Sequence, residues 1–163
     1  MSDGRSDSVV IERIVDATVD RVWQMWTDPQ QFAQWYGPDG STIQVAKMDT
    51  SVGGARLVRM DVDTPGGPRR MWFSGEHLEV IDNKRLVYTE SMSDEHGNVL
   101  APSDIGMPAD HPVTTQVVIE LEDLGDRTKM VLTHIGVPSG SPGATGWIMA
   151  LDKLALVLAD STT

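Results

Sequence analysis

The sequence contains no cysteine, and this absence excludes three kinds of chemistry. A disulfide framework, a thiolate metal site and a cysteine nucleophile all need the sulfur atom that the chain lacks. The composition fits a reducing compartment, and we expect a cytoplasmic protein. Residues 1–8 lack the apolar segment behind a basic start that marks a secretory signal, and we expect them to form a flexible tail.

Long apolar runs and positive charge are also scarce. No segment reaches the about 20 consecutive apolar residues that a membrane-spanning helix needs, so integral membrane association is not expected. The chain has 24 acidic and 13 basic residues, which give a formal net charge of -11. Such a charge repels phosphate backbones, and nucleic acid is therefore not an expected partner.

The motifs of several catalytic classes are missing as well. The sequence has no Gly-x-Ser-x-Gly elbow, no phosphate-binding loop and no dinucleotide fingerprint. Its four histidines, His77, His96, His111 and His134, do not have the short spacings of metal ligands. The sequence therefore predicts no metal site and no cofactor, and it assigns no catalytic residue. Whether the protein is an enzyme stays open, with the balance against it.

Residues 143–160 form the longest segment with a helical period. Apolar side chains recur there at the i, i+3, i+4 and i+7 spacing of an amphipathic helix, and they are Trp147, Ile148, Leu151, Leu154, Ala155 and Leu158. Less than half of the circumference is polar, so we expect this helix to lie deep against a sheet.

The rest of the chain shows strand and turn patterns. Alternating segments between turn residues predict strands at 8–15, 42–48, 55–62, 70–81, 85–92, 114–124 and 128–137. Two short helices should follow the first strand, with Thr18 capping one and Asp28 capping the other, where Gln31 completes a capping box. This order favours an α+β fold with about six to seven antiparallel strands in a single domain over 9–160.

A long connection, residues 93–112, separates two of the predicted strands. Loops above about 12 to 15 residues are usually functional or disordered. One interpretation of this loop is a lid.

Several short motifs occur in a characteristic order along the chain. They are Val22-Trp23, Thr27-Asp28-Pro29, Trp35-Tyr36-Gly37-Pro38, Gly53-Gly54, Phe73-Ser74-Gly75-Glu76, the segments 85–89 and 128–134, and Gly146-Trp147. Over residues 9–160 the chain resembles the START-like (SRPBCC, helix-grip) superfamily, and within it the homologues of the heat-shock protein 90 ATPase activator. The resemblance implies a curved antiparallel sheet wrapped around the C-terminal helix, with an apolar cavity between them. That superfamily uses the cavity to carry lipids, sterols, polyketides or plant hormones, and it implies no shared catalytic residue.

Ten residues are candidates for the wall of this cavity: Trp35, Tyr36, Trp72, His77, Tyr88, Met92, Val117, His134, Trp147 and Leu151. Three of them, His77, Tyr88 and His134, could orient a polar group of the ligand. His134 follows Met130 and Leu132 in the two-residue phase of a strand, so it should be buried and hydrogen-bonded. Ordinary core packing would use the same residues equally well.

The sequence leaves three functions open. The first is binding of a small hydrophobic or aromatic ligand in the cavity. The second is a chaperone-interacting module that acts through its outer surface. The third, a cyclase or hydrolase, would need His77 or His134 beside a carboxylate inside the cavity, and Glu76 or Glu90 could form such a pair with His77. A homodimer formed through edge strands also stays open.

Overall fold

The computed structural model describes residues 8–37, 40–101, 103, 113–137 and 142–160. Its elements follow the order β1 (Ser8–Val15), α1 (Val19–Thr27), α2 (Pro29–Phe32), β2 (Ser41–Met48), β3 (Ala55–Thr64), β4 (Gly67–Ile81), β5 (Arg85–Ser93), β6 (Thr115–Asp123), β7 (Thr128–Ile135) and α3 (Pro142–Asp160). Half of the predicted 93–112 loop, and all of the predicted 1–8 tail except Ser8, lies outside these residues. The predicted lid therefore falls largely outside the described part of the chain.

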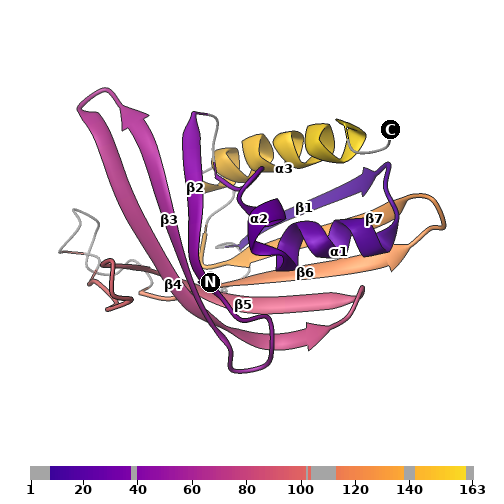
Figure 1. Ribbon diagram of the computed structural model, residues 1–163, viewed down its shortest axis with the longest axis horizontal. Coiled ribbons are helices and arrows are strands. Elements are labelled where there is room, and N and C mark those ends of the chain that lie inside the picture. Colours follow the sequence, from indigo (N-terminus) through magenta and orange to yellow (C-terminus); the bar gives the residue numbers. More distant parts are fainter. Residues whose placement is uncertain (1–7, 38–39, 102, 104–112, 138–141, 161–163) are drawn as a thin grey trace, which may run out of the picture.

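The seven strands form one antiparallel sheet in the order β1-β7-β6-β5-β4-β3-β2. Strands β2 to β7 are sequential neighbours, and β1 returns to pair with β7. The sheet curves strongly, and the three helices lie together on its concave side (Figure 1). The predicted α+β helix-grip fold is confirmed, with β1 and β2 as its edges.

The core forms where the concave face of the sheet meets α3. Met130 and Leu132 of β7 point to that face, and Leu151 and Leu154 of α3 pack opposite them, all at most 1 % exposed. Full burial of such a side chain stabilises the fold by about 1.5 to 3 kcal/mol. His134 shares the phase of Met130 and Leu132 and is buried too, which confirms the phase predicted for this strand.

The buried stripe of α3 differs from the predicted one. Ile148 and Ala155 were expected on the buried face, but both are exposed, whereas Ala150 is buried. Each helical residue turns by about 100°, so Ile148 and Ala155 lie at the side of the buried stripe that runs through Leu151 and Leu154. The predicted apolar face was therefore too wide on that side.

The two short helices begin differently. The Asp28 carboxylate accepts hydrogen bonds from the backbone N–H groups of Gln30 (2.9 Å) and Gln31 (3.3 Å), so the predicted cap of α2 is confirmed. Thr18 occupies the position before α1, but its side chain makes no capping hydrogen bond with the described residues. Thr18 is therefore the N-cap residue of α1, as predicted, but it lacks the capping hydrogen bond of its side chain. Packing of the apolar side of α1 holds this helix in place.

An aromatic cluster joins the helices at one end of the concave face. Helix α2 ends at Phe32, but the backbone N–H groups of Trp35 and Tyr36 still bond to the Phe32 carbonyl, which continues the turn. Trp35 packs edge-on against Trp26 of α1, and Tyr36 packs edge-on against Trp147 of α3, with ring centroids 4.6 Å and 5.4 Å apart. Residues that follow α2 therefore reach the start of α3.

Strand β4 has no room for a side chain at Gly75, where it runs beside β5. A Cβ atom at this position would overlap the backbone carbonyl of Thr89, so only glycine fits there without a shift of the strands. Gly75 pairs with Arg56 of β3. A stretch of β4 without a side chain therefore separates Arg56 from β5.

Candidate functional site

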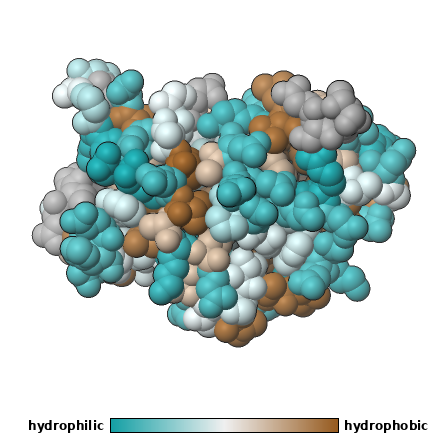
Figure 2. Space-filling model, viewed as in Figure 1, coloured by the Kyte–Doolittle hydropathy of each residue, from teal (hydrophilic) through white to brown (hydrophobic). Residues whose placement is uncertain are grey.

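A pocket of about 720 Å³ lies between the start of α3 and the concave face of strands β3 to β5. Its lining consists of Tyr36, Gly37, Met60, Met71, Phe73, Glu90, His134, Thr145, Gly146, Trp147, Met149 and Ala150. Most of these residues are apolar, and three are methionines, whose flexible side chains adapt to different shapes. In the face shown in Figure 2, hydrophilic residues predominate and hydrophobic residues surface in a few groups, one near the middle of the view.

Glu90 of β5 is the carboxylate of this lining. The Tyr36 hydroxyl donates a hydrogen bond of 2.9 Å to Glu90 Oε2. The Tyr36 and Tyr88 hydroxyl oxygens are 3.1 Å apart. Since the single hydroxyl proton of Tyr36 goes to the carboxylate, Tyr88 must donate to Tyr36. The two tyrosines therefore form a directed chain of hydrogen bonds that ends on Glu90.

Arg56 stands behind Glu90 as a buried positive charge. Its side chain is 1 % exposed, and its Nη1 atom lies 3.6 Å from Glu90 Oε2. The guanidinium carbon lies 3.9 Å from the centre of the Tyr88 ring and 5.5 Å from that of Phe32. None of its three nitrogen atoms has a hydrogen-bond partner among the described residues. Ion pairing and ring contacts therefore have to offset a desolvation cost of several kcal/mol.

Gly75 explains how this ion pair forms. Arg56 belongs to β3 and Glu90 to β5, so the pair bridges the intervening strand β4. Because the β4 partner of Arg56 is a glycine, no side chain separates the two charges there.

Burial opposes the charge of Arg56, but Tyr88, Tyr36 and Glu90 outweigh it and raise the pKa of Arg56. The guanidinium remains positive.

A second chain of hydrogen bonds reaches Glu90 from α3. Trp147 Nε1 donates to His134 Nδ1 at 2.8 Å, and His134 Nε2 lies 2.8 Å from the Thr115 hydroxyl. The Thr115 hydroxyl donates to the Glu90 backbone carbonyl at 3.2 Å. An indole nitrogen can only donate, so His134 Nδ1 accepts and His134 Nε2 carries the proton. The start of α3 is thereby tied to β7, β6 and β5.

The burial of these groups holds them in their neutral forms. Burial lowers the pKa of His134, although the negative charge of Glu90 opposes this shift. Burial also raises the pKa of Tyr36, with Glu90 adding to the effect, and it raises the pKa of Tyr88. The histidine and both tyrosines are therefore uncharged near neutral pH, and the ionic groups of the cluster are Arg56 and Glu90.

His77 lies apart from this arrangement. Its Nδ1 atom is 3.2 Å from the backbone carbonyl of Gly54, and the side chain is buried against the turn before β3. Burial, followed by the charge of Arg56, lowers the pKa of His77. Glu76 is exposed, and Glu90 bonds to Tyr36 instead. Among the described residues, no acid–base pair forms between His77 and either carboxylate.

The structure brings only some of the predicted cavity residues together. Tyr36, His134 and Trp147 line the pocket. The lining does not include five others, which are at most 1 % exposed: Trp35, His77, Tyr88, Val117 and Leu151. Met92 lies on the face of Glu90, farther along β5, and is half-buried.

Trp72 does not belong to the pocket lining. Its neighbours on β4, Met71 and Phe73, both line the pocket, and successive strand residues point to opposite faces. The side chain of Trp72 therefore points to the convex face. The phase of the strand thus selects Met71 and Phe73 for the lining and excludes Trp72.

Several lining residues were not predicted. Met60, Met149 and Ala150 belong to no distinctive motif, and Gly146 was expected only as part of the Gly146-Trp147 motif. Arg56, which lies behind the lining, was not predicted either. Glu90 was considered only as a partner for His77. The sequence did contain one signal, the two-residue phase of the strand. Arg56, Val58 and Met60 are two positions apart, so their side chains lie on the same face of β3.

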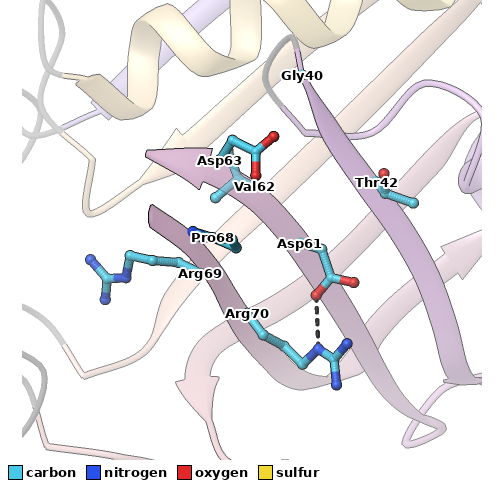
Figure 3. Close-up of a pocket in the computed structure, with 8 residues that line it drawn as sticks. All are labelled: Gly40, Thr42, Asp61, Val62, Asp63, Pro68, Arg69 and Arg70. Carbon is cyan, nitrogen blue, oxygen red and sulfur yellow. Dashed lines mark hydrogen bonds and ion pairs between the residues drawn. The ribbon is translucent and has the colours of Figure 1, made fainter. Parts of the chain in front are cut away.

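A second, polar pocket of about 420 Å³ lies where β2 begins, β3 ends and β4 begins. Figure 3 shows Asp61 within it, bonded to Arg70 at 2.9 Å, and Arg59 lies 3.2 Å from the same carboxylate. The Arg70 hydrogen bond lowers the pKa of Asp61. Arg59 and Arg70 are therefore both already paired with Asp61.

Comparison with known proteins identifies the family. Residues 16–159 match the sequence profile of the family described as Activator of Hsp90 ATPase homolog 1-like protein. The chain belongs to this family. No curated protein sequence matches the chain.

Solved structures share the fold of the family. A protein from Arthrobacter aurescens superimposes with a TM-score of 0.78 at 24 % identity, over 100 % of this chain and 92 % of that one. A Chromobacterium violaceum protein gives a TM-score of 0.75 at 24 % identity, over 93 % and 96 %. The AHSA1 protein from Silicibacter pomeroyi gives 0.67 at 21 % identity, over 93 % and 97 %.

Further features of the described residues bear on the site. None of their helices is long and apolar enough to cross a membrane. Within the same residues, no group of three or more histidine, aspartate or glutamate side chains is arranged to hold a metal ion.

The neutral state of His134 predicts a pH dependence of stability. The pKa of His134 is lowered in the folded protein from its ordinary value of 6.5, so the unfolded chain binds more protons below that pH. The free energy of unfolding should therefore fall as the pH falls through about 6.5, by up to about 1.4 kcal/mol per pH unit from this group. His134→Gln keeps one acceptor and one donor but cannot titrate, and its unfolding curves should show a shallower pH dependence.

Urea unfolding between pH 7.5 and 5 measures this difference. His96→Gln is the control, because the His96 side chain is 75 % exposed and its replacement should leave the slope of the wild type. Equal slopes for His134→Gln and the wild type would contradict the neutral, buried assignment.

Proposed function

We propose that the pocket beneath the start of α3 binds a small hydrophobic or aromatic molecule. The observation that carries this proposal is an apolar pocket of about 720 Å³ with a carboxylate in its wall. Ligand sites are typically 300 to 1,000 Å³ in volume, predominantly apolar, and supplied with a few polar groups that orient the ligand. The pocket fits this description in size and in chemistry.

The walls of the pocket combine adaptable and rigid surfaces. Met60, Met71 and Met149 supply flexible apolar side chains, while Phe73 and Trp147 supply aromatic rings. The Trp147 ring is held by its hydrogen bond to His134 and by its contact with Tyr36. A flat aromatic or branched aliphatic molecule would bury its surface against both kinds of wall.

Gly146 offers a direct test because it lines the pocket at the start of α3. A Cβ atom added there would meet no other atom within 4 Å, so a larger side chain has room to extend into the pocket. Gly146→Phe should fill the space that a ligand would occupy while α3 keeps its form. We expect the affinity for naphthalene and 1-decanol, measured by isothermal titration calorimetry, to fall at least roughly tenfold.

Ile148→Phe is the matched control, because Ile148 lies on the same helix and is 48 % exposed. This variant should bind both molecules as the wild type does. Binding that Gly146→Phe leaves unchanged would place the ligand elsewhere and contradict the proposal. Failure of the wild type to bind a broader panel of lipids and aromatics would contradict it as well.

Contact with a chaperone is the second candidate function, and the family's description names activation of the Hsp90 ATPase. Leu156 on the outer side of α3 is 66 % exposed and offers apolar surface to a partner. If this surface acts, the chain should stimulate Hsp90 ATPase turnover, and Leu156→Glu should reduce that stimulation severalfold while Gly146→Phe leaves it intact. Turnover that the wild-type chain does not alter would remove this candidate.

A further inference from the structure

We infer that the pocket selects molecules with an apolar body and one hydrogen-bond donor, a hydroxyl or an amine, and that Glu90 accepts this bond. The inference rests on the proposed function and specifies the ligand of the same pocket. Its basis is a contrast within the lining. Glu90 faces the pocket with one oxygen that accepts no hydrogen bond from any described residue, whereas the other polar side chains of the lining already use their bonding groups.

The two carboxylate oxygens of Glu90 differ in their surroundings. Oε2 accepts the Tyr36 hydroxyl and faces Arg56. Oε1 has no hydrogen bond from any described residue, yet Glu90 lines the pocket and its side chain is 12 % exposed. A carboxylate oxygen accepts hydrogen bonds and donates none. The polar end of the pocket therefore presents an open acceptor.

The remaining polar side chains offer little to a ligand. The Tyr36 hydroxyl donates to Glu90 and accepts from Tyr88, and both ring nitrogens of His134 are bonded. The Trp147 N–H group is used by His134, and Thr145 already has an interaction. A ligand acceptor such as a carbonyl or an ether thus finds no free side-chain donor in the described lining.

Arg56 does not convert the site into an anion site. Its guanidinium is 1 % exposed, lies against the ring of Tyr88, and is absent from the pocket lining. Glu90 stands between this charge and the pocket. A carboxylate ligand would meet the negative Glu90 first, and two like charges at close range repel each other strongly in a poorly solvated site.

Four probes with one ring system separate these possibilities: naphthalene, 2-naphthol, 2-methoxynaphthalene and 2-naphthoate. The naphthol donates a hydrogen bond, the methoxy compound only accepts one, and the naphthoate carries a negative charge. Because a bond to a charged acceptor strengthens binding by roughly ten- to hundredfold, 2-naphthol should bind better than naphthalene by about that factor. The naphthoate should bind more weakly than naphthalene.

Glu90→Gln tests the residue itself. The new amide oxygen can still accept from Tyr36, while its NH₂ group offers a donor to the pocket. The ratio of 2-naphthol affinity to 2-methoxynaphthalene affinity should therefore fall by roughly tenfold or more relative to the wild type. Because this change leaves Arg56 without its counter-ion, the double variant Arg56→Met/Glu90→Gln is the companion, and it should show the same loss of preference.

The outcomes separate this inference from the proposed function. Equal ratios in the wild type and both variants, or tightest binding of 2-naphthoate, would overturn the inference while the pocket remains a ligand site. If none of the four probes binds, and Gly146→Phe alters no binding in the broader panel, the proposed function fails. Binding of naphthalene that Gly146→Phe abolishes, together with the naphthol preference, supports both.

Discussion

The ion pair between Arg56 and Glu90 is the interaction on which the site depends. It places two charges on the concave face of a sheet whose other inward side chains are mainly apolar, and the desolvation of buried charges costs several kcal/mol. The fold meets this constraint with aromatic rings on Arg56 and a hydrogen-bonded tyrosine on Glu90. The strand between them, β4, has a glycine at position 75, so no β4 side chain lies between Arg56 on β3 and Glu90 on β5.

Glu90 also connects the polar end of the pocket to the helices. Its carboxylate receives the chain that starts at Tyr88 and passes through Tyr36, which follows α2. Its backbone carbonyl receives the chain that starts at Trp147 on α3. The position of α3 over the sheet is therefore coupled to the same residue that faces the pocket. Such a hydrogen-bonded network fixes the position of the α3 wall of the pocket relative to the Glu90 carboxylate.

Much of the fold could be predicted from the sequence, because periodicity and turn residues act locally. The two-residue phase placed His134 on the buried face, and the helical period located α3. The same phase argued against assigning both Trp72 and His77 to one cavity, because the two residues are five positions apart on β4 and their side chains point to opposite faces. The Arg56–Glu90 ion pair could not be predicted from local sequence patterns. It joins β3 to β5 across β4, and it therefore depends on tertiary packing.

The methyl NMR spectrum of the methionines tests whether a ligand binds in the pocket beside Glu90. Met60, Met71 and Met149 line the pocket, whereas Met25 and Met130 lie in the core and are at most 1 % exposed. With 2-naphthol added to saturation, we expect shifted methyl resonances for the three lining residues and nearly unchanged ones for the two core residues. Binding that leaves the lining methyls unshifted would contradict the claim that the ligand occupies this pocket beside Glu90.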